Sequence, residues 1–128
     1  MTVHVPPTRP ADLTSHALGE TSAAVRLRVQ AARLMQRERY RKVPGVFCNA
    51  HVSGRWLERN TRIDSAACAV LVQAAERLHF SARAYHRVLR VARTVADLET
   101  SDAIRPEHVA TGVRYRSLGT GSERPASA

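Results

Sequence analysis

Ser81 and Arg83 are the residues whose types and spacing indicate the most specific chemistry, because they stand at the start of a predicted helix. Ser81 is a good N-cap residue, and Arg83 follows at about the second helical position, between Ala82 and Ala84. The helix dipole places partial positive charge there, so a cation is unfavourable unless an anion lies nearby. Open backbone N–H groups beside an arginine form a competent phosphate site. A solvated arginine that bends away from the helix end fits the same residues, and spacing alone leaves both interpretations open.

Patterns typical of catalysis and metal binding are missing. No Ser, Cys or His stands in a recognisable nucleophile signature. Cys48 and His51 have half of a zinc-ligand spacing without a second pair at a suitable distance, so no metal site is expected. A phosphate-binding P-loop needs closely spaced glycines before its lysine, whereas Arg41 precedes Lys42 and no glycine lies in the required window. The chain by itself is therefore predicted not to be an enzyme.

The charge balance indicates an anionic partner. Twenty Lys and Arg residues against 11 Asp and Glu residues give a net charge of +9. Helical spacing gathers arginines on two faces, and the candidates for DNA or subunit contacts are Arg33, Arg37, Arg87 and Arg90. Such faces neutralise phosphates with an affinity that falls as salt rises. The arginine- and alanine-rich composition of a GC-rich genome gives similar solvated faces, and aromatic residues are not interleaved with these arginines. A stand-alone basic DNA-binding module is thus the alternative function.

Compartment and membrane signals point to the cytoplasm. The longest apolar run, residues 66–72, is far shorter than the roughly 18 residues that span a bilayer. The N-terminus lacks the basic start and apolar stretch of a signal peptide. Cys48 and Cys68 are accordingly expected to be reduced thiols.

Apolar periodicity predicts an all-α fold, a small bundle of four to five helices with disordered termini. The expected helices cover residues 22–42, 54–60, 65–78, 82–99 and 106–115. The third of these has few polar residues and is expected to be the most buried. Residues 1–21 are rich in helix breakers and form a linker, 22–116 form the helical domain, and 117–128 form a disordered tail.

Helical spacing also predicts the core. The expected interior residues are Val70, Leu71, Tyr85, Val88, Val91, Ala92, Val95 and Leu98. Asp97 falls on the opposite, polar half of its helix. Trp56 is expected to pack its short helix against the core, and His86 and His108 are expected on helix surfaces.

Residues 80–99 closely resemble the C-terminal helical domain of the magnesium-chelatase-like AAA+ ATPases of the ComM/YifB group. The specific part is the run Ser-Ala-Arg-Ala-Tyr-His-Arg at 81–87. The resemblance extends back to Gly19 and forward to Arg116, so it covers most of the predicted domain. A more distant likeness to MCM helicases and magnesium-chelatase motor subunits covers the Ser-x-Arg helix.

In such ATPases this domain is a lid over nucleotide held by the preceding P-loop domain. The resemblance implies that Arg83 is the sensor-2 arginine, which reaches the γ-phosphate from a helix end formed with Ser81, Ala82 and Ala84. It implies ATP and Mg²⁺ as cofactors of the intact parent only. It also implies three partners: the upstream ATPase domain, neighbouring subunits of a hexameric ring, and DNA. Residues 3–6 resemble the last strand of that upstream domain, so the chain is expected to be a lid from a longer ATPase.

Overall fold

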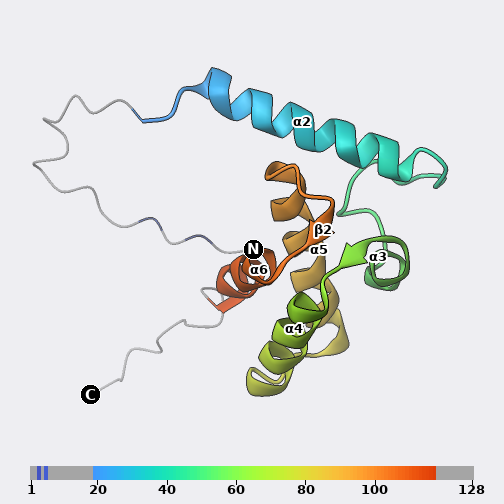
Figure 1. Ribbon diagram of the computed structural model, residues 1–128, viewed down its shortest axis with the longest axis vertical. Coiled ribbons are helices and arrows are strands. Elements are labelled where there is room, and N and C mark those ends of the chain that lie inside the picture. The colour runs from blue at the N-terminus through green and yellow to red at the C-terminus, as the bar shows by residue number, and fades with distance from the viewer. Residues whose placement is uncertain (1–2, 4, 6–18, 118–128) are drawn as a thin grey trace, which may run out of the picture.

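The computed structural model describes residues 3, 5 and 19–117 (Figure 1). This part contains five helices: α2 (Ser22–Tyr40), α3 (Gly54–Asn60), α4 (Ser65–Arg77), α5 (Ala82–Leu98) and α6 (Pro106–Ser117). Two short strands, β1 (Arg62–Ile63) and β2 (Ala103–Ile104), pair in parallel. The all-α prediction is confirmed, and every expected helix is present within two residues of its predicted ends. Most of the predicted linker and the predicted tail lie outside the described residues.

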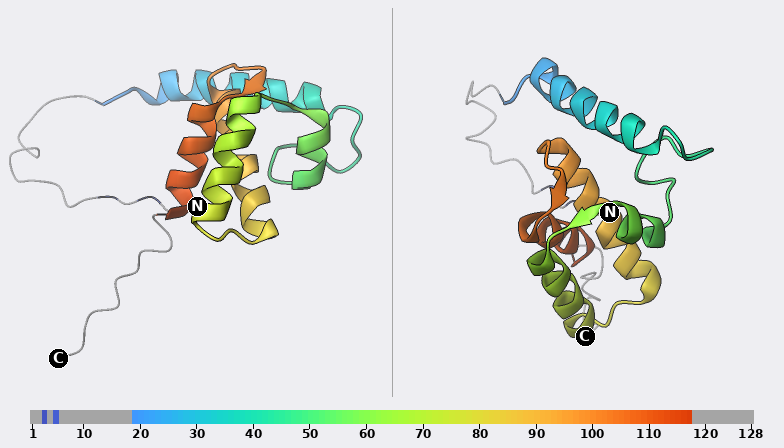
Figure 2. Two further views of the ribbon diagram at one scale, coloured as in Figure 1. Left: turned by 60° about the horizontal axis from the view of Figure 1, so that its bottom comes forward. Right: turned by 45° about the vertical axis from the view of Figure 1, so that its right-hand side comes forward.

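Three helices form the body of the domain. Figure 2 shows α4, α5 and α6 side by side, with α2 lying across one end of them. The chain reverses between α4 and α5 at the opposite end, so α5 begins far from α2 and ends beneath it. The short helix α3 packs against α5, and the strand pair joins the connection before α4 to the connection before α6.

Helix α5 is the centre of the fold. The Ser81 side chain caps it by accepting a hydrogen bond from the Ala84 N–H at 3.3 Å. Its buried residues are Ala84, Val88, Leu89, Ala92, Arg93, Ala96 and Asp97. By contrast α4 buries only Ala67 and Leu71, so the prediction that α4 is the most buried helix is wrong. The reason is position, because α5 contacts α2, α3, α4, α6 and β2, whereas α4 packs chiefly on α6.

The predicted core is partly confirmed. Leu71, Val88 and Ala92 are buried, and the other predicted residues except Leu98 are half-buried. Leu98 is 39% exposed, because its side chain lines an open groove rather than the interior. Trp56 packs against the core as predicted, with its ring centroid 5.3 Å from that of Tyr40.

A polar cluster lies at the centre of the domain, around a residue that helical spacing places on the polar half of α5. Asp97 is fully buried, which corrects its placement on the polar half of α5. Its carboxylate accepts hydrogen bonds from Arg93 Nε at 3.0 Å, from Arg39 at 2.5 and 2.9 Å, and from Asn49 Nδ2 at 2.8 Å. Asn49 also accepts from the Tyr40 hydroxyl at 2.6 Å. Helix α2 and the following loop are therefore held to α5 largely by charge-assisted hydrogen bonds.

The two arginines respond differently to burial beside Asp97. Burial opposes the charge of Arg39, but the hydrogen bond and negative charge of Asp97 outweigh it, so the pKa of Arg39 is raised. Arg93 is fully buried, and burial lowers its pKa despite the attraction of Asp97. Its remaining N–H groups are satisfied by backbone carbonyls, Asp102 O at 2.7 Å and Ser101 O at 2.5 Å. Arg93 thereby holds the chain that leaves α5 and enters β2.

His108 is fully buried, so the prediction that it lies on a helix surface is wrong. Its Nδ1 accepts from the Arg105 N–H at 2.9 Å, and its Nε2 lies 3.0 Å from a Glu99 carboxylate oxygen. His108, the third residue of α6, thus accepts from the backbone N–H of the residue before the helix, as the glutamate of a capping box does. His86 is half-buried, and a Cβ at Gly54 would come 2.3 Å from its ring, so a glycine is required there for α3 to pack on α5.

We predict that Asp97→Ala strongly destabilises the domain. The substitution leaves Arg93 and Arg39 without their buried counter-charge, a change that costs about 3–5 kcal/mol in comparable pairs. Urea denaturation followed by Trp56 fluorescence measures the change in the free energy of unfolding. Asp102→Ala is the matched control, because its ion pair with Arg62 is exposed and is expected to contribute little. Equal stability of the two variants would contradict the central role of Asp97.

Candidate functional site

The predicted nucleotide-facing helix end is held in place by a tight turn between α4 and α5. His79 has a φ of 49°, and the Phe80 N–H donates to the Ala75 carbonyl at 2.9 Å. Phe80 then packs against the core, which fixes the backbone just before Ser81. The first turn of α5 is therefore anchored by its neighbours on the N-terminal side.

The first turn of α5 presents donors and no acid. The Ala84 N–H is used by Ser81 Oγ, whereas the N–H groups of Ala82 and Arg83 have no acceptor in the described part of the chain. Arg83 is exposed, and its side chain has no partner among the described residues. The first turn contains no acidic residue. The end thus combines a cation, two open amides and the positive pole of a 17-residue helix.

A second arginine lies near this helix end and was missed in the sequence. The Arg116 guanidinium lies over the Phe80 ring, 4.6 Å from its centroid. This cation–π contact brings the last turn of α6 beside the residue that precedes Ser81. Sequence spacing carries no signal for this contact, because the two residues come together only when α6 packs on α5.

The four arginines predicted to touch DNA or a subunit come from two helices, α5 and α2. Arg87 and Arg90 line a groove of about 490 Å³ whose wall includes Val91, Val95 and Tyr115. Arg90 donates weakly, at 3.4 Å, to the carbonyls of the loop before α3.

The other two arginines of that set, Arg33 and Arg37, lie on α2. Helix α2 crosses the C-terminal end of α5, where Asp97 binds Arg39. Arg83 lies in the first turn of α5, so 14 residues at 1.5 Å each separate the two levels by about 21 Å along the helix. The nucleotide candidate and the α2 arginines therefore occupy opposite ends of the domain.

Arg33 lies beside a thiol. Burial tends to raise the pKa of Cys48, but hydrogen bonds from the Ala50 N–H, the Arg33 side chain and the His51 N–H outweigh it. The net effect lowers the pKa of Cys48. Cys48 and Cys68 are both free.

Metal-ligand clusters and membrane-spanning helices are both missing from the described part of the chain. Within residues 19–117, no three His, Cys, Asp or Glu side chains gather as metal ligands would. Over the same residues, every helix is too short or too polar to cross a membrane.

Comparison with known proteins identifies the family. The family model described as "Magnesium chelatase, subunit ChlI C-terminal" matches residues 19–116. Competence protein ComM of Haemophilus influenzae is 38% identical over 78% of this chain and 19% of its own length. The uncharacterized protein YifB of Salmonella typhimurium is 34% identical over 92% of this chain and 22% of its own length. An uncharacterized protein of Mycobacterium tuberculosis is 39% identical over 82% of this chain and 21% of its own length. No solved structure gives a significant match.

The chain belongs to the magnesium-chelatase C-terminal domain family found in ComM/YifB-type proteins. This confirms the resemblance seen in residues 19–116. The chain spans about a fifth of the length of the curated relatives it matches.

We predict that Arg33→Ala slows alkylation of Cys48. A lowered pKa gives more thiolate at a fixed pH, and the substitution removes one of the groups that lower it. The rate with iodoacetamide, measured from pH 6 to 9 in a Cys68→Ser background, is expected to have its midpoint moved to higher pH. Arg37→Ala serves as the control. An unchanged midpoint would show that Arg33 does not stabilise the thiolate.

Proposed function

We propose that this domain is the nucleotide-sensing lid of a ComM/YifB-type AAA+ ATPase and that Arg83 is its sensor-2 arginine. The observation that carries the proposal is the unpaired cation, among the described residues, in an acid-free first turn of α5. A cation there is unfavourable unless an anion is present, and a nucleotide phosphate supplies one. Family membership adds that the relatives are about five times longer, which leaves room for an ATP-binding domain.

The helix end fits a phosphate group by its chemistry. The guanidinium of Arg83 and the open N–H groups of Ala82 and Arg83 would hold phosphate oxygens, while Ser81 keeps the helix end in shape through Ala84. ATP and Mg²⁺ would be bound chiefly by the upstream domain of the parent, because this chain carries no P-loop. The part played by Arg83 is electrostatic: it stabilises negative charge on the terminal phosphate.

Coupling between sites would pass along α5. The helix carries Arg83 in its first turn and the buried pair Arg93 and Asp97 in its last two turns. A shift of the first turn toward phosphate would therefore move the residues that hold α2. In the intact parent, the upstream domain and neighbouring ring subunits are the surfaces against which this lid would move.

A second candidate function is DNA binding by the exposed arginines, in line with a parent that acts on DNA. It is favoured by the net charge of +9 and by the groove that Arg87 and Arg90 line. The predicted arginines come from two helices, Arg33 and Arg37 from α2 and Arg87 and Arg90 from α5.

We predict that Arg83→Ala in the full-length parent lowers the rate of ATP turnover by at least about tenfold, as removal of one well-placed charged donor typically does. Steady-state turnover and ATP affinity of the parent measure the effect. The side chain has no partner among the described residues and stands at the positive end of the helix dipole, so the melting temperature of this 128-residue chain is expected to stay the same or to rise slightly.

Arg77→Ala is the matched control, because Arg77 is an exposed arginine in the last turn of α4, just before the same turn. Arg83→Lys is expected to retain part of the activity through its charge. Turnover that stays normal in Arg83→Ala would overturn the sensor assignment.

A further inference from the structure

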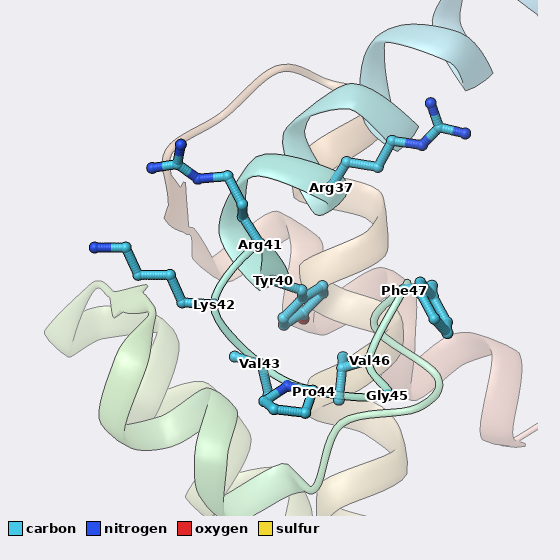
Figure 3. Close-up of a pocket in the computed structure, with 9 residues that line it drawn as sticks. All are labelled: Arg37, Tyr40, Arg41, Lys42, Val43, Pro44, Gly45, Val46 and Phe47. Carbon is cyan, nitrogen blue, oxygen red and sulfur yellow. The ribbon is translucent and has the colours of Figure 1, made fainter.

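A pocket of about 380 Å³ opens at the C-terminal end of α2, away from the first turn of α5 (Figure 3). Its floor is the edge of the Tyr40 ring together with the loop 43–46. Figure 3 shows Arg41 and Lys42 on one side of the Tyr40 ring and Arg37 and Phe47 on the other. The pocket therefore combines an apolar floor with a cationic rim.

The rim is almost purely cationic. Arg37, Arg41 and Lys42 line it. One acid lies near them, Glu38, whose carboxylate is 3.5 Å from Arg41 Nε. Both side chains of that pair are mostly exposed, so the pairing is weak and readily exchanged for another anion. Cations at a helix C-terminus also satisfy the helix dipole, which explains Arg37 and Arg41 without a ligand. It does not explain Phe47.

Phe47 is the unusual residue of this surface, because its side chain is 71% exposed. The loop before it is well formed: the Val43 N–H donates to Tyr40 O at 2.8 Å, and Gly45 takes a φ of 74° that suits glycine. Val43 and Val46 pack against the core. The loop thus packs its valines inward and leaves the phenyl ring outside, with its ring at 87° to that of His51 at 6.2 Å.

We propose that this surface binds single-stranded nucleic acid, with a base stacked on Phe47 and the neighbouring phosphates on Arg37, Arg41 and Lys42. An exposed ring beside a cationic rim is the combination that single-strand binders use, because every base has a stacking face and every nucleotide a phosphate. A duplex keeps its bases stacked inside and offers this ring nothing. An acidic peptide would satisfy the cations but would not need a planar ring. The inference deepens the proposed action of the parent on DNA and does not depend on Arg83.

The test separates stacking from charge by using two probes and the 128-residue chain. One probe is fluorescein-labelled oligothymidylate of about 12 nucleotides, within the usual site size of small single-strand binders. The other is an abasic deoxyribose-phosphate chain of the same length. Binding of both is measured by fluorescence anisotropy at several salt concentrations.

Phe47→Ala is expected to weaken binding of oligothymidylate by roughly 5- to 150-fold, the range found when one base–aromatic stack is removed. Binding of the abasic chain is expected to stay unchanged. Phe47→Trp is expected to retain affinity for oligothymidylate. Leu27→Ala is the matched control, since Leu27 is an exposed apolar side chain at the far end of α2.

Arg37→Ala, Arg41→Ala and Lys42→Ala are expected to weaken binding of both probes. Removal of each phosphate-binding side chain is expected to flatten the slope of log affinity against log salt by about 0.7. Melting temperatures of the Phe47 and Lys42 variants are expected to match that of the unsubstituted chain, because these side chains lie on the surface. Those of Arg37→Ala and Arg41→Ala are expected to fall slightly, because each loses a cation near the C-terminal end of α2.

Three results would overturn the proposal. In the first, Phe47→Ala weakens binding of both probes equally. In the second, the chain binds polyglutamate as tightly as oligothymidylate, which would make this an acidic-protein surface. In the third, oligothymidylate binding survives the double substitution of Arg37 and Arg41 but is abolished by Arg87→Ala. That third result would place the DNA contact in the groove lined by Arg87. ATP turnover is expected to stay normal in a Phe47→Ala parent, so a failure of this proposal and a failure of the Arg83 assignment can be told apart.

Discussion

The architecture of this domain depends on one buried carboxylate. Asp97 accepts hydrogen bonds from Arg93 of its own helix, from Arg39 of α2 and from Asn49 of the loop that follows α2. The apolar contribution to the same contact is small, because α2 buries only Ala32, Gln36 and Tyr40. A helix with so little buried hydrocarbon needs directional bonds to fix its angle and register, and a bidentate arginine–carboxylate pair provides them. The charge is tolerated inside because Asp97 accepts hydrogen bonds at both of its carboxylate oxygens.

Arg93 extends this organisation to the other half of the fold. By donating to the carbonyls of Ser101 and Asp102, it fixes the chain as it leaves α5, and β2 then pairs with β1. His108 continues the same pattern at the start of α6. Buried polar groups thus set the connections, while the aliphatic residues of α4, α5 and α6 supply the bulk of the core. Helix α5 joins this polar centre to the exposed first turn that carries Arg83.

The features that could be predicted from sequence are the local ones. Helix ends could be predicted from residues such as Ser81, because an N-cap bonds to the first turn of its own helix. The exposure of Arg83 could be predicted from its place in that turn. The predictions for Asp97 and His108 were wrong because their partners, such as Arg39 and Glu99, come from other segments of the chain. A helical wheel shows one helix alone, so it places a polar residue without a visible partner on the surface. The one available signal was the spacing of Arg93 and Asp97, four residues apart on the same helix. Phe47 was missed because loop conformation, unlike helical periodicity, leaves no pattern to count.

The attachment of α2 has a mechanical consequence. Its buried residues all lie between Ala32 and Tyr40, so residues 22–31 extend from the body as a rod clamped at one end. Val25, Leu27 and Val29 are exposed along this free arm. The arm is about 15 Å long, so a tilt of about 10° at the clamp would displace its tip by about 3 Å. A small rotation near Asp97 would therefore become a larger displacement of the exposed N-terminal turns of α2.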